Sequence, residues 1–216
     1  MFDMTTIDGV VQEHSTEVSD TGFKVSHKNG TYDNVADTVR DVFSTAKGLV
    51  WQHYKIDASS HNQHETVKSA IIRSLIKYGA GEEYAASFAK VVMEGVENIK
   101  KHNYKFAPGK TVNIDFTSTQ QYDVCTISGE GEIPHIEDIE HAFDEAKTYF
   151  RIIQELIDKK ITREEALPQI SNNRMGFKNI LLSTDYMQFE LYNGTTYWIL
   201  LKFRPSVTNQ PDEENH

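Results

Sequence analysis

The sequence predicts an α+β fold, because segments with a helical period and segments with strand alternation follow one another along the chain. Apolar residues recur every three to four positions in 84–104 and 136–157, which is the pattern of amphipathic helices. Shorter segments alternate apolar and polar residues in two pairs, as antiparallel strands do. These pairs are 111–116 with 122–127 and 187–192 with 195–203. We therefore expect helices packed against an antiparallel sheet.

Composition limits the classes of partner and compartment. A formal net charge of −10 argues against a general nucleic-acid or anionic-membrane surface, since both need a basic face. Cys125 is the only cysteine, so we interpret it as a buried apolar side chain in a reducing compartment. We find neither a signal-like run nor the roughly 18 apolar residues of a membrane span. We expect a cytoplasmic protein that binds neither nucleic acid nor membrane.

The two ends of the chain are expected to lie outside the main domain. Residues 1–22 are polar and lack a period, which predicts a loose N-terminal arm. Residues 23–51 contain a strand pattern and then a helix pattern, and we interpret them as an N-terminal extension. The polar tail 205–216 is predicted to be disordered.

A strand and a helix are predicted next. Residues 49–56 read as a strand, and the polar run 59–65 offers caps for a helix that ends at Gly79. His61 and His64 in that run have a spacing seen in metal sites, but the sequence around them supplies no complete ligand set. We interpret both as solvated histidines of the capping region.

The helix predicted at 84–104 carries a polar stripe beside its apolar face. Glu94, Asn98 and Lys101 recur at steps of four and three, so their side chains line up along the helix. A carboxylate can accept a proton, an amide oxygen can bind a hard metal ion, and a cation can meet phosphate. The alternative is a solvated helix face, with Glu97 and Lys101 forming an i,i+4 ion pair.

The second half of the chain alternates glycine loops with helices and ends in a hairpin. The loop 128–134 contains two glycines, and the loop 171–178 places Gly176 at a helix start, where backbone N–H groups can meet an anion. Plain turns explain both loops equally well. Thr162 and Glu165 form a capping box for a short helix, and Asn193-Gly194 is a strong hairpin signal.

This order of elements resembles the GHKL ATPase superfamily, in particular the bacterial anti-sigma-factor serine/threonine kinases. The residues Met93-Glu94-Gly95-Val96-Glu97-Asn98-Ile99-Lys100-Lys101-His102 are similar to the family's N box. The resemblance spans about residues 52–204, with an extra helical lid insertion at 135–172. It implies a two-layer α/β sandwich of the Bergerat type, in which a mixed, mostly antiparallel sheet is covered on one face by helices.

The resemblance also implies ATP and Mg²⁺ as cofactors. Glu94 would then be the general base, Asn98 the magnesium ligand, and Lys101 and His102 phosphate contacts. The remaining cofactor-binding positions carried over from the family are Ser128, Gly129, Gly131, Gly176 and Thr195. The chain departs from the family where Ser128 stands for an Asp that reads adenine, and where Glu130 and Glu132 stand for glycines.

Three functional interpretations follow. In the first, the protein is a signalling regulator that acts as an ATP- and magnesium-dependent serine/threonine kinase or anti-sigma-type switch on a small antagonist protein. In the second, the glycine loops lack residues that the family uses to bind nucleotide. This indicates a nucleotide-independent module that binds a signalling partner through its helical insertion. In the third, it is an unrelated two-layer α+β domain. A homodimer is left open in each case.

Overall fold

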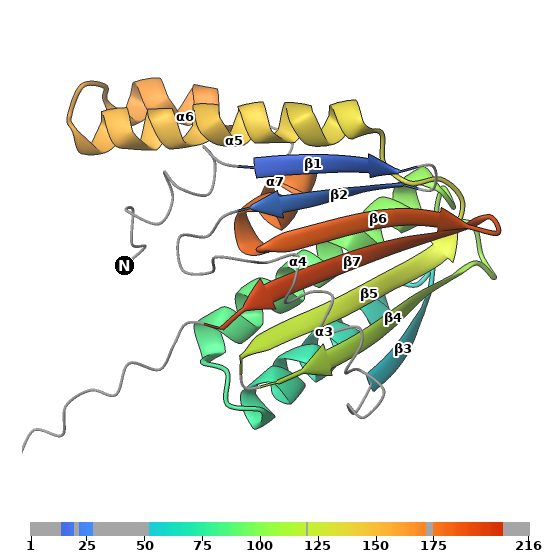
Figure 1. Ribbon diagram of the computed structural model, residues 1–216. Coiled ribbons are helices and arrows are strands. Elements are labelled where there is room, and N and C mark those ends of the chain that lie inside the picture. The colour runs from blue at the N-terminus through green and yellow to red at the C-terminus, as the bar shows by residue number, and fades with distance from the viewer. Residues whose placement is uncertain (1–13, 20–21, 28–51, 120, 172–174, 205–216) are drawn as a thin grey trace, which may run out of the picture.

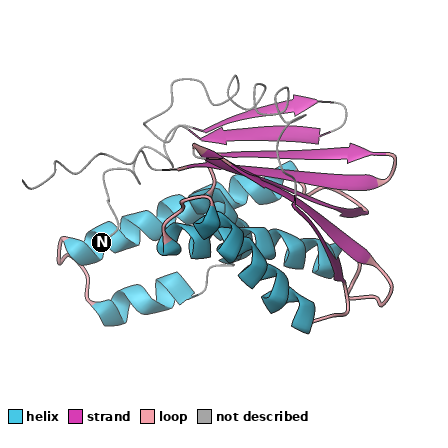
Figure 2. Cartoon of the chain, turned by 90° about the horizontal axis from the view of Figure 1, so that it is seen from below, coloured by secondary structure: helices cyan, strands magenta, loops and turns pink. Residues whose placement is uncertain are grey.

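The computed structural model describes residues 14–19, 22–27, 52–119, 121–171 and 175–204 of the chain. They form a single sheet with helices on one face, as the two views at right angles show (Figures 1 and 2). The strands are β1 (His14–Ser19), β2 (Gly22–His27), β3 (Gln52–Asp57), β4 (Thr111–Ser118), β5 (Tyr122–Glu130), β6 (Tyr186–Tyr192) and β7 (Thr195–Phe203). The helices are α3 (Asn62–Lys77), α4 (Glu82–His102), α5 (Ile136–Ile157), α6 (Arg163–Ser171) and α7 (Met175–Ser183).

The sheet confirms the predicted two-layer α+β class. Its seven strands run in the order β1-β2-β6-β7-β5-β4-β3. All six pairings are antiparallel, so the described sheet is not mixed. The β6–β7 hairpin turns at Asn193 and Gly194, whose φ angles of 50° and 74° are those that a tight hairpin turn requires. None of the described helices is long and apolar enough to cross a lipid bilayer.

The N-terminal part of the sheet differs from the sequence prediction. Residues 14–19 form β1 and pair with β2, so the expectation of a loose arm is wrong for this part of 1–22. The polar alternation of His14–Ser19 hid the strand, because an edge strand needs few apolar side chains. Since β2 pairs with β6, the sheet also joins the predicted extension to the predicted main domain. The helix expected within 23–51 and the tail 205–216 lie outside the described residues.

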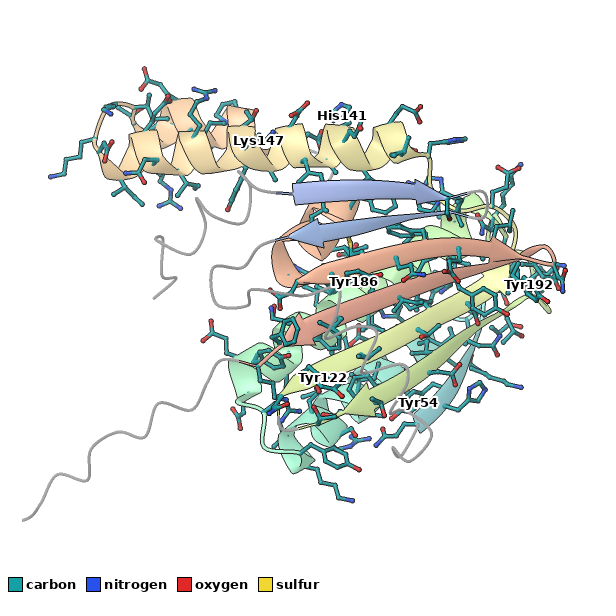
Figure 3. The ribbon with its side chains drawn as sticks, in the orientation of Figure 1. Tyr54, Tyr122, His141, Lys147, Tyr186 and Tyr192 are labelled. Atoms are coloured by element: carbon teal, nitrogen blue, oxygen red, sulfur yellow. The ribbon has the colours of Figure 1, made fainter. Side chains whose placement is uncertain are left out.

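One face of the sheet carries the main core. Strand residues that point toward the helices are largely apolar, and α3 and α4 bury their apolar stripes against them. The opposite face carries a smaller cluster around Val124 and Leu201, to which the labelled Tyr122 and Tyr186 belong (Figure 3). Cys125 is fully buried on the helix side, as predicted, and burial raises the pKa of its thiol well above the usual value.

Helix α4 lies very close to the sheet at Gly95. A Cβ atom at this position would stand 2.6 Å from the Cδ1 atom of Ile127 and 3.5 Å from the indole of Trp198. The first distance is shorter than any ordinary carbon–carbon contact, so a larger residue requires the end of the Ile127 side chain to shift. Glycine at this position allows the close approach without such a shift.

Gly95→Ala should lower the free energy of unfolding by about 1–3 kcal/mol through overpacking. This cost should appear even though alanine is favoured over glycine within helices by about 1 kcal/mol. Ile127→Val removes the clashing Cδ1 atom, so the cost of Gly95→Ala should fall by more than about 0.5 kcal/mol in that background. Urea unfolding of the four proteins measures the coupling. Additive effects would contradict the proposed contact.

A buried ion pair ties the end of β7 to the rest of the fold. Arg204 binds Asp123 through two hydrogen bonds of 2.9 Å, and the two residues are 7% and 0% exposed. The hydroxyl of Tyr84 on α4 donates to Asp123 at 2.8 Å, and burial followed by this carboxylate raises the pKa of Tyr84. Arg204 also donates to the carbonyl of Tyr78 after α3. The Asp123–Arg204 pair thus connects the sheet to α4 through Tyr84 and to the end of α3 through Tyr78.

Asp123→Ala should destabilise the protein by about 3–5 kcal/mol, because it removes a buried carboxylate that binds the guanidinium of Arg204. The double variant Asp123→Leu, Arg204→Met removes both charges and should lose much less stability. Thermal and urea unfolding compare the two. Equal losses in the single and double variants would show that the ion pair is not what the site depends on.

Candidate ligand cavity

A cavity of about 260 Å³ opens between the C-terminal end of α4, the loop before α5, and the residues of α7 and β7 beneath them. We call it the Asn98 cavity. Its lining comes from four secondary-structure elements and one loop that are distant in sequence. The lining residues are Asn98, His102, Asn103, Glu132, Ile133, Pro134, His135, Asp138, Phe177 and Trp198.

One wall of the Asn98 cavity is aromatic. The rings of Phe177 and Trp198 stack with centroids 5.5 Å apart and an interplanar angle of 25°. Phe189 supports Trp198 from the sheet in an edge-on contact of 5.1 Å. The indole N–H of Trp198 donates to Thr196 at 3.2 Å, so its polar atom is satisfied within β7. Each ring therefore covers one face of the other, and the pair forms an apolar wall in which Trp198 is only 3% exposed.

Asn98 brings an unsatisfied donor to this wall. Its Nδ2 atom is buried and makes no hydrogen bond to any residue that the structure describes. Such a group costs about 1–3 kcal/mol relative to a satisfied one. One turn further on, the corresponding amide of Asn103 donates to the carbonyl of Glu132 at 3.1 Å. Two asparagines at the same cavity thus differ in that only Asn103 has its partner within the protein.

The structure divides the predicted polar stripe of α4. Asn98 and His102 line the cavity, whereas Glu94 and Lys101 are not among its lining residues. Glu94 is half-buried and Lys101 is exposed. The predicted Glu97–Lys101 pair is wrong, because Glu97 binds Lys100 at 2.9 Å.

The buried Lys100 has no freedom to meet a ligand. Its side chain is fully buried, and its ammonium group also donates to the carbonyl of Ser60 at 3.1 Å. Near it, the Nε2 atom of His64 lies 3.6 Å from Glu97, and the His64 side chain is only 20% exposed. The prediction of solvated histidines is therefore confirmed for the exposed His61 and wrong for His64.

The first glycine loop is shorter than predicted. Strand β5 continues through Glu130, so Ser128 and Gly129 belong to the sheet. Ser128 points away from α4, because Ile127 beside it faces Gly95 and strand side chains alternate. Gly129 leaves room for Tyr104, whose hydroxyl would lie 2.6 Å from an added Cβ. That hydroxyl accepts from the N–H of Glu130 at 2.6 Å and donates to the carbonyl of Thr111 at 3.0 Å.

Gly131 also has a packing role. Its φ of 123° suits glycine, and an added Cβ would lie 2.7 Å from the side chain of Asn103. Its N–H donates to the carbonyl of Gly194 at 3.0 Å, which joins the end of β5 to the β6–β7 turn. The requirement for glycine at 129 and 131 is thus explained by contacts within the fold.

The other predicted site residues lie elsewhere. Gly129 and Thr195 line a second hollow of about 410 Å³, and Gly131 lines a third of about 540 Å³. Lys110 lines both of these hollows but is paired with Glu130 at 2.5 Å, and this contact raises the pKa of Lys110. Gly176 lies in the first turn of α7, as predicted. Among the described residues, the predicted site residues are therefore spread over several places.

Sequence reasoning missed most of the cavity. Phe177 follows the predicted Gly176 directly, and Trp198 lies three residues after the predicted Thr195, but neither position shows chemistry by its spacing. His135 and Asp138 belong to the start of α5, which the periodicity did identify. They are identified as site residues only because the fold places them in the same cavity as Asn98.

The described residues do not fit a magnesium–nucleotide site well. They contain no group of three or more His, Cys, Asp or Glu side chains arranged to hold a metal ion. The described lining of the cavity contains Glu132 and Asp138 but neither Lys nor Arg, which disfavours a polyphosphate. We therefore assign no chemical step to ATP or Mg²⁺.

Comparison with known proteins found no matching family model and no matching curated protein. Among solved structures, a chain of the SiaB–SiaC complex from Pseudomonas aeruginosa is similar over 80% of this chain and 99% of its own, with 14% identity and a TM-score of 0.43. Similarity at this level does not carry a function from one protein to the other.

These findings overturn the GHKL resemblance. No family model matches the chain, and a solved structure that is similar to it comes from a SiaB–SiaC complex. The physical reason is local: the N-box-like stripe on α4 reflects helical periodicity, and its Glu94 and Lys101 stand apart from the cavity that Asn98 lines. The Bergerat-type ATP-binding fold and an adenine-binding role for position 128, which the resemblance implied, lose their support for the same reason.

Asn98→Leu should raise the free energy of unfolding by about 1 kcal/mol, because it replaces an unsatisfied buried amide by an apolar side chain of similar shape. Asn103→Leu is the matched control. It removes an amide that is already hydrogen-bonded and should lower stability by about 1 kcal/mol. Urea unfolding of both variants measures the two signs. Destabilisation by Asn98→Leu would mean that its amide has a partner in solution.

Proposed function

We propose that the protein is a regulator that works by binding a signalling partner through the helical arm formed by α5 and α6, without transferring phosphate. The observation that carries the proposal is a pair of large apolar side chains at the end of this arm. Ile157 on α5 is 54% exposed and Leu167 on α6 is 51% exposed. Contiguous exposed apolar surface marks protein-binding sites, and these two side chains are our candidates for such a surface.

The way the arm is built supports this proposal. Near its start, α5 is anchored in the main core by Ile139, Ala142 and Phe143. Further along, Ile152 on α5 and Ala166 on α6 are buried outside that core, and the two helices contact each other. Figures 1 and 2 both show this end of the arm reaching past the other helices. The arm is thus a firmly based element with an accessible end.

The start of α6 is held by its own local bonds. The N–H of Glu165 donates to the hydroxyl of Thr162 at 3.3 Å, and the Glu165 carboxylate accepts from the N–H of Thr162 at 2.8 Å. This reciprocal bonding is the predicted capping box, and it lowers the pKa of Glu165. A preformed helix loses little conformational entropy on binding, which favours recognition.

Charge indicates the kind of partner. Helix α5 contains six Asp or Glu residues and two Lys or Arg residues. Its labelled His141 and Lys147 lie on the helix surface, and the His141 side chain is 73% exposed (Figure 3). A small protein with an apolar patch bordered by basic side chains would match this surface in both shape and charge.

The double variant Ile157→Asp, Leu167→Asp should reduce partner affinity at least about 30-fold, because burying a charge at each apolar contact costs more than 1 kcal/mol. The protein is used to capture partners from a lysate of its own source cells, and a captured protein is then purified and titrated. Ile76→Asp on α3 is the matched control, since Ile76 is 40% exposed but distant from the arm in the fold. It should bind as the unaltered protein does.

Asn98→Ala separates this proposal from the kinase interpretation. Partner binding should be unchanged within about twofold, since Asn98 is not on the exposed end of the arm. No phosphate should pass to the partner from ATP and Mg²⁺. Transfer that is lost in Glu94→Ala would refute the proposal, as would equal binding by the arm variant and the control.

A further inference from the structure

The Asn98 cavity combines three features that the proposed arm does not use. It has a rigid aromatic wall, a buried donor without a partner, and a lining with carboxylates but no described Lys or Arg. Each feature restricts the chemistry of a molecule that could occupy the cavity. Together they point to a single ligand class.

The wall restricts the shape of the ligand. Phe177 is half-buried and is backed by Trp198, which is 3% exposed, and Ile133 and Pro134 add apolar surface from the loop before α5. Planar rings stack well on such a surface. The volume of about 260 Å³ is at the lower end of small-molecule sites, so it suits a compact ligand of one or two rings.

Asn98 restricts the hydrogen bonding. Its Nδ2 atom is a donor, so the ligand must carry an acceptor, such as a ring nitrogen or a carbonyl oxygen, near the aromatic wall. A hydrogen bond from the amide offsets the cost of desolvating the ligand's acceptor. The amide of Asn98 therefore lowers the stability of the protein without ligand and raises its affinity for a ligand with such an acceptor.

The carboxylates restrict the charge. Glu132 and Asp138 both line the cavity, in a chain whose formal net charge is −10. An anionic ligand would meet repulsion from both groups, and the described lining offers no Lys or Arg to offset it. An uncharged or cationic ligand meets no such penalty. His102 and His135 can add hydrogen bonds from either side of the cavity.

We infer that the Asn98 cavity is a binding site for a compact planar heterocycle without negative charge, stacked near Phe177 and Trp198 and accepting a hydrogen bond from Asn98. This goes beyond the proposed partner binding, because the ligand and the surface differ. The two lie at opposite ends of one helix: His135 and Asp138 belong to the start of α5, and the same helix carries Ile157 at its other end. A bound heterocycle would contact the base of the arm.

The test uses uncharged probes and their anionic counterparts. The probes are indole, benzimidazole and adenosine, with indole-3-carboxylate and AMP as matched anions. Binding is measured by ligand-observed NMR and by the shift of the melting temperature, which rises with occupancy of the folded state. Trp51 is replaced by Phe, so that Trp198 becomes the only tryptophan and its fluorescence reports on the cavity directly.

At least one uncharged probe should bind saturably, with a Kd below about 1 mM. It should change the fluorescence of Trp198, and its anion should bind at least about tenfold more weakly. Asn98→Leu should weaken binding about tenfold while the protein stays folded. Glu94→Gln, on the same helix but outside the lining, should bind unchanged.

Three results would overturn the inference. They are no saturable binding of any probe at about 5 mM, tighter binding of the anions, or equal binding by Asn98→Leu and the unaltered protein. Phe177→Ala provides a second variant, which should lose the stacking contact without touching the amide. These outcomes are independent of the arm variants, so failure here leaves the partner proposal to its own test.

Discussion

The close approach of α4 to the sheet at Gly95 is the constraint on which the rest of the structure depends. Because a Cβ at this position would lie 2.6 Å from Ile127, the helix rests directly on β5 and beside Trp198 of β7. The contact at Gly95 also positions the C-terminal turns of α4 relative to the sheet. Asn98 is brought to the aromatic wall, and Tyr104 just after the helix reaches the backbone of β5 and β4. One missing methyl group thus sets the geometry of the cavity.

Stability and binding conflict at this cavity. The fold satisfies the amide of Asn103 but leaves that of Asn98 buried without a partner among the described residues. A fold selected for stability alone would gain by an apolar side chain there. Among the described residues, the Nε2 atom of His64 is a second buried atom without a hydrogen bond. The Asp123–Arg204 site is well paired by contrast, because Tyr84 and Ser118 also bond to the carboxylate. The contrast is what draws attention to Asn98.

Charge is distributed unevenly over the molecule. Lys100 and Lys110 are both paired with carboxylates, since Lys100 binds Glu97 and Lys110 binds Glu130. What remains around the cavity is acidic, and α5 is acidic as well. The protein therefore presents apolar and acidic surfaces to a ligand and to a partner. Both inferred binding modes follow from that distribution rather than from any phosphate chemistry.

The sequence by itself determined the elements whose signals are local. Helix α5 has the predicted ends because its apolar period is strong, α6 begins at its capping box, and β6–β7 turns at Asn193-Gly194. These signals depend on neighbours within a few residues, so they can be read without the fold. The α+β class follows from them, because helices and antiparallel strands of this kind must cover one another.

Only the tertiary structure decided how those elements combine. Strand β1 owes its existence to pairing with β2, Lys100 owes its burial to Ser60 and Glu97, and Gly129 is needed because Tyr104 returns to it. The composition of the Asn98 cavity is likewise set by residues up to 100 positions apart, such as Asn98 and Trp198. Spacing along one helix could suggest a polar stripe, but it could not tell which of its members faces a cavity. That distinction depends on contacts between distant segments, which no local pattern contains.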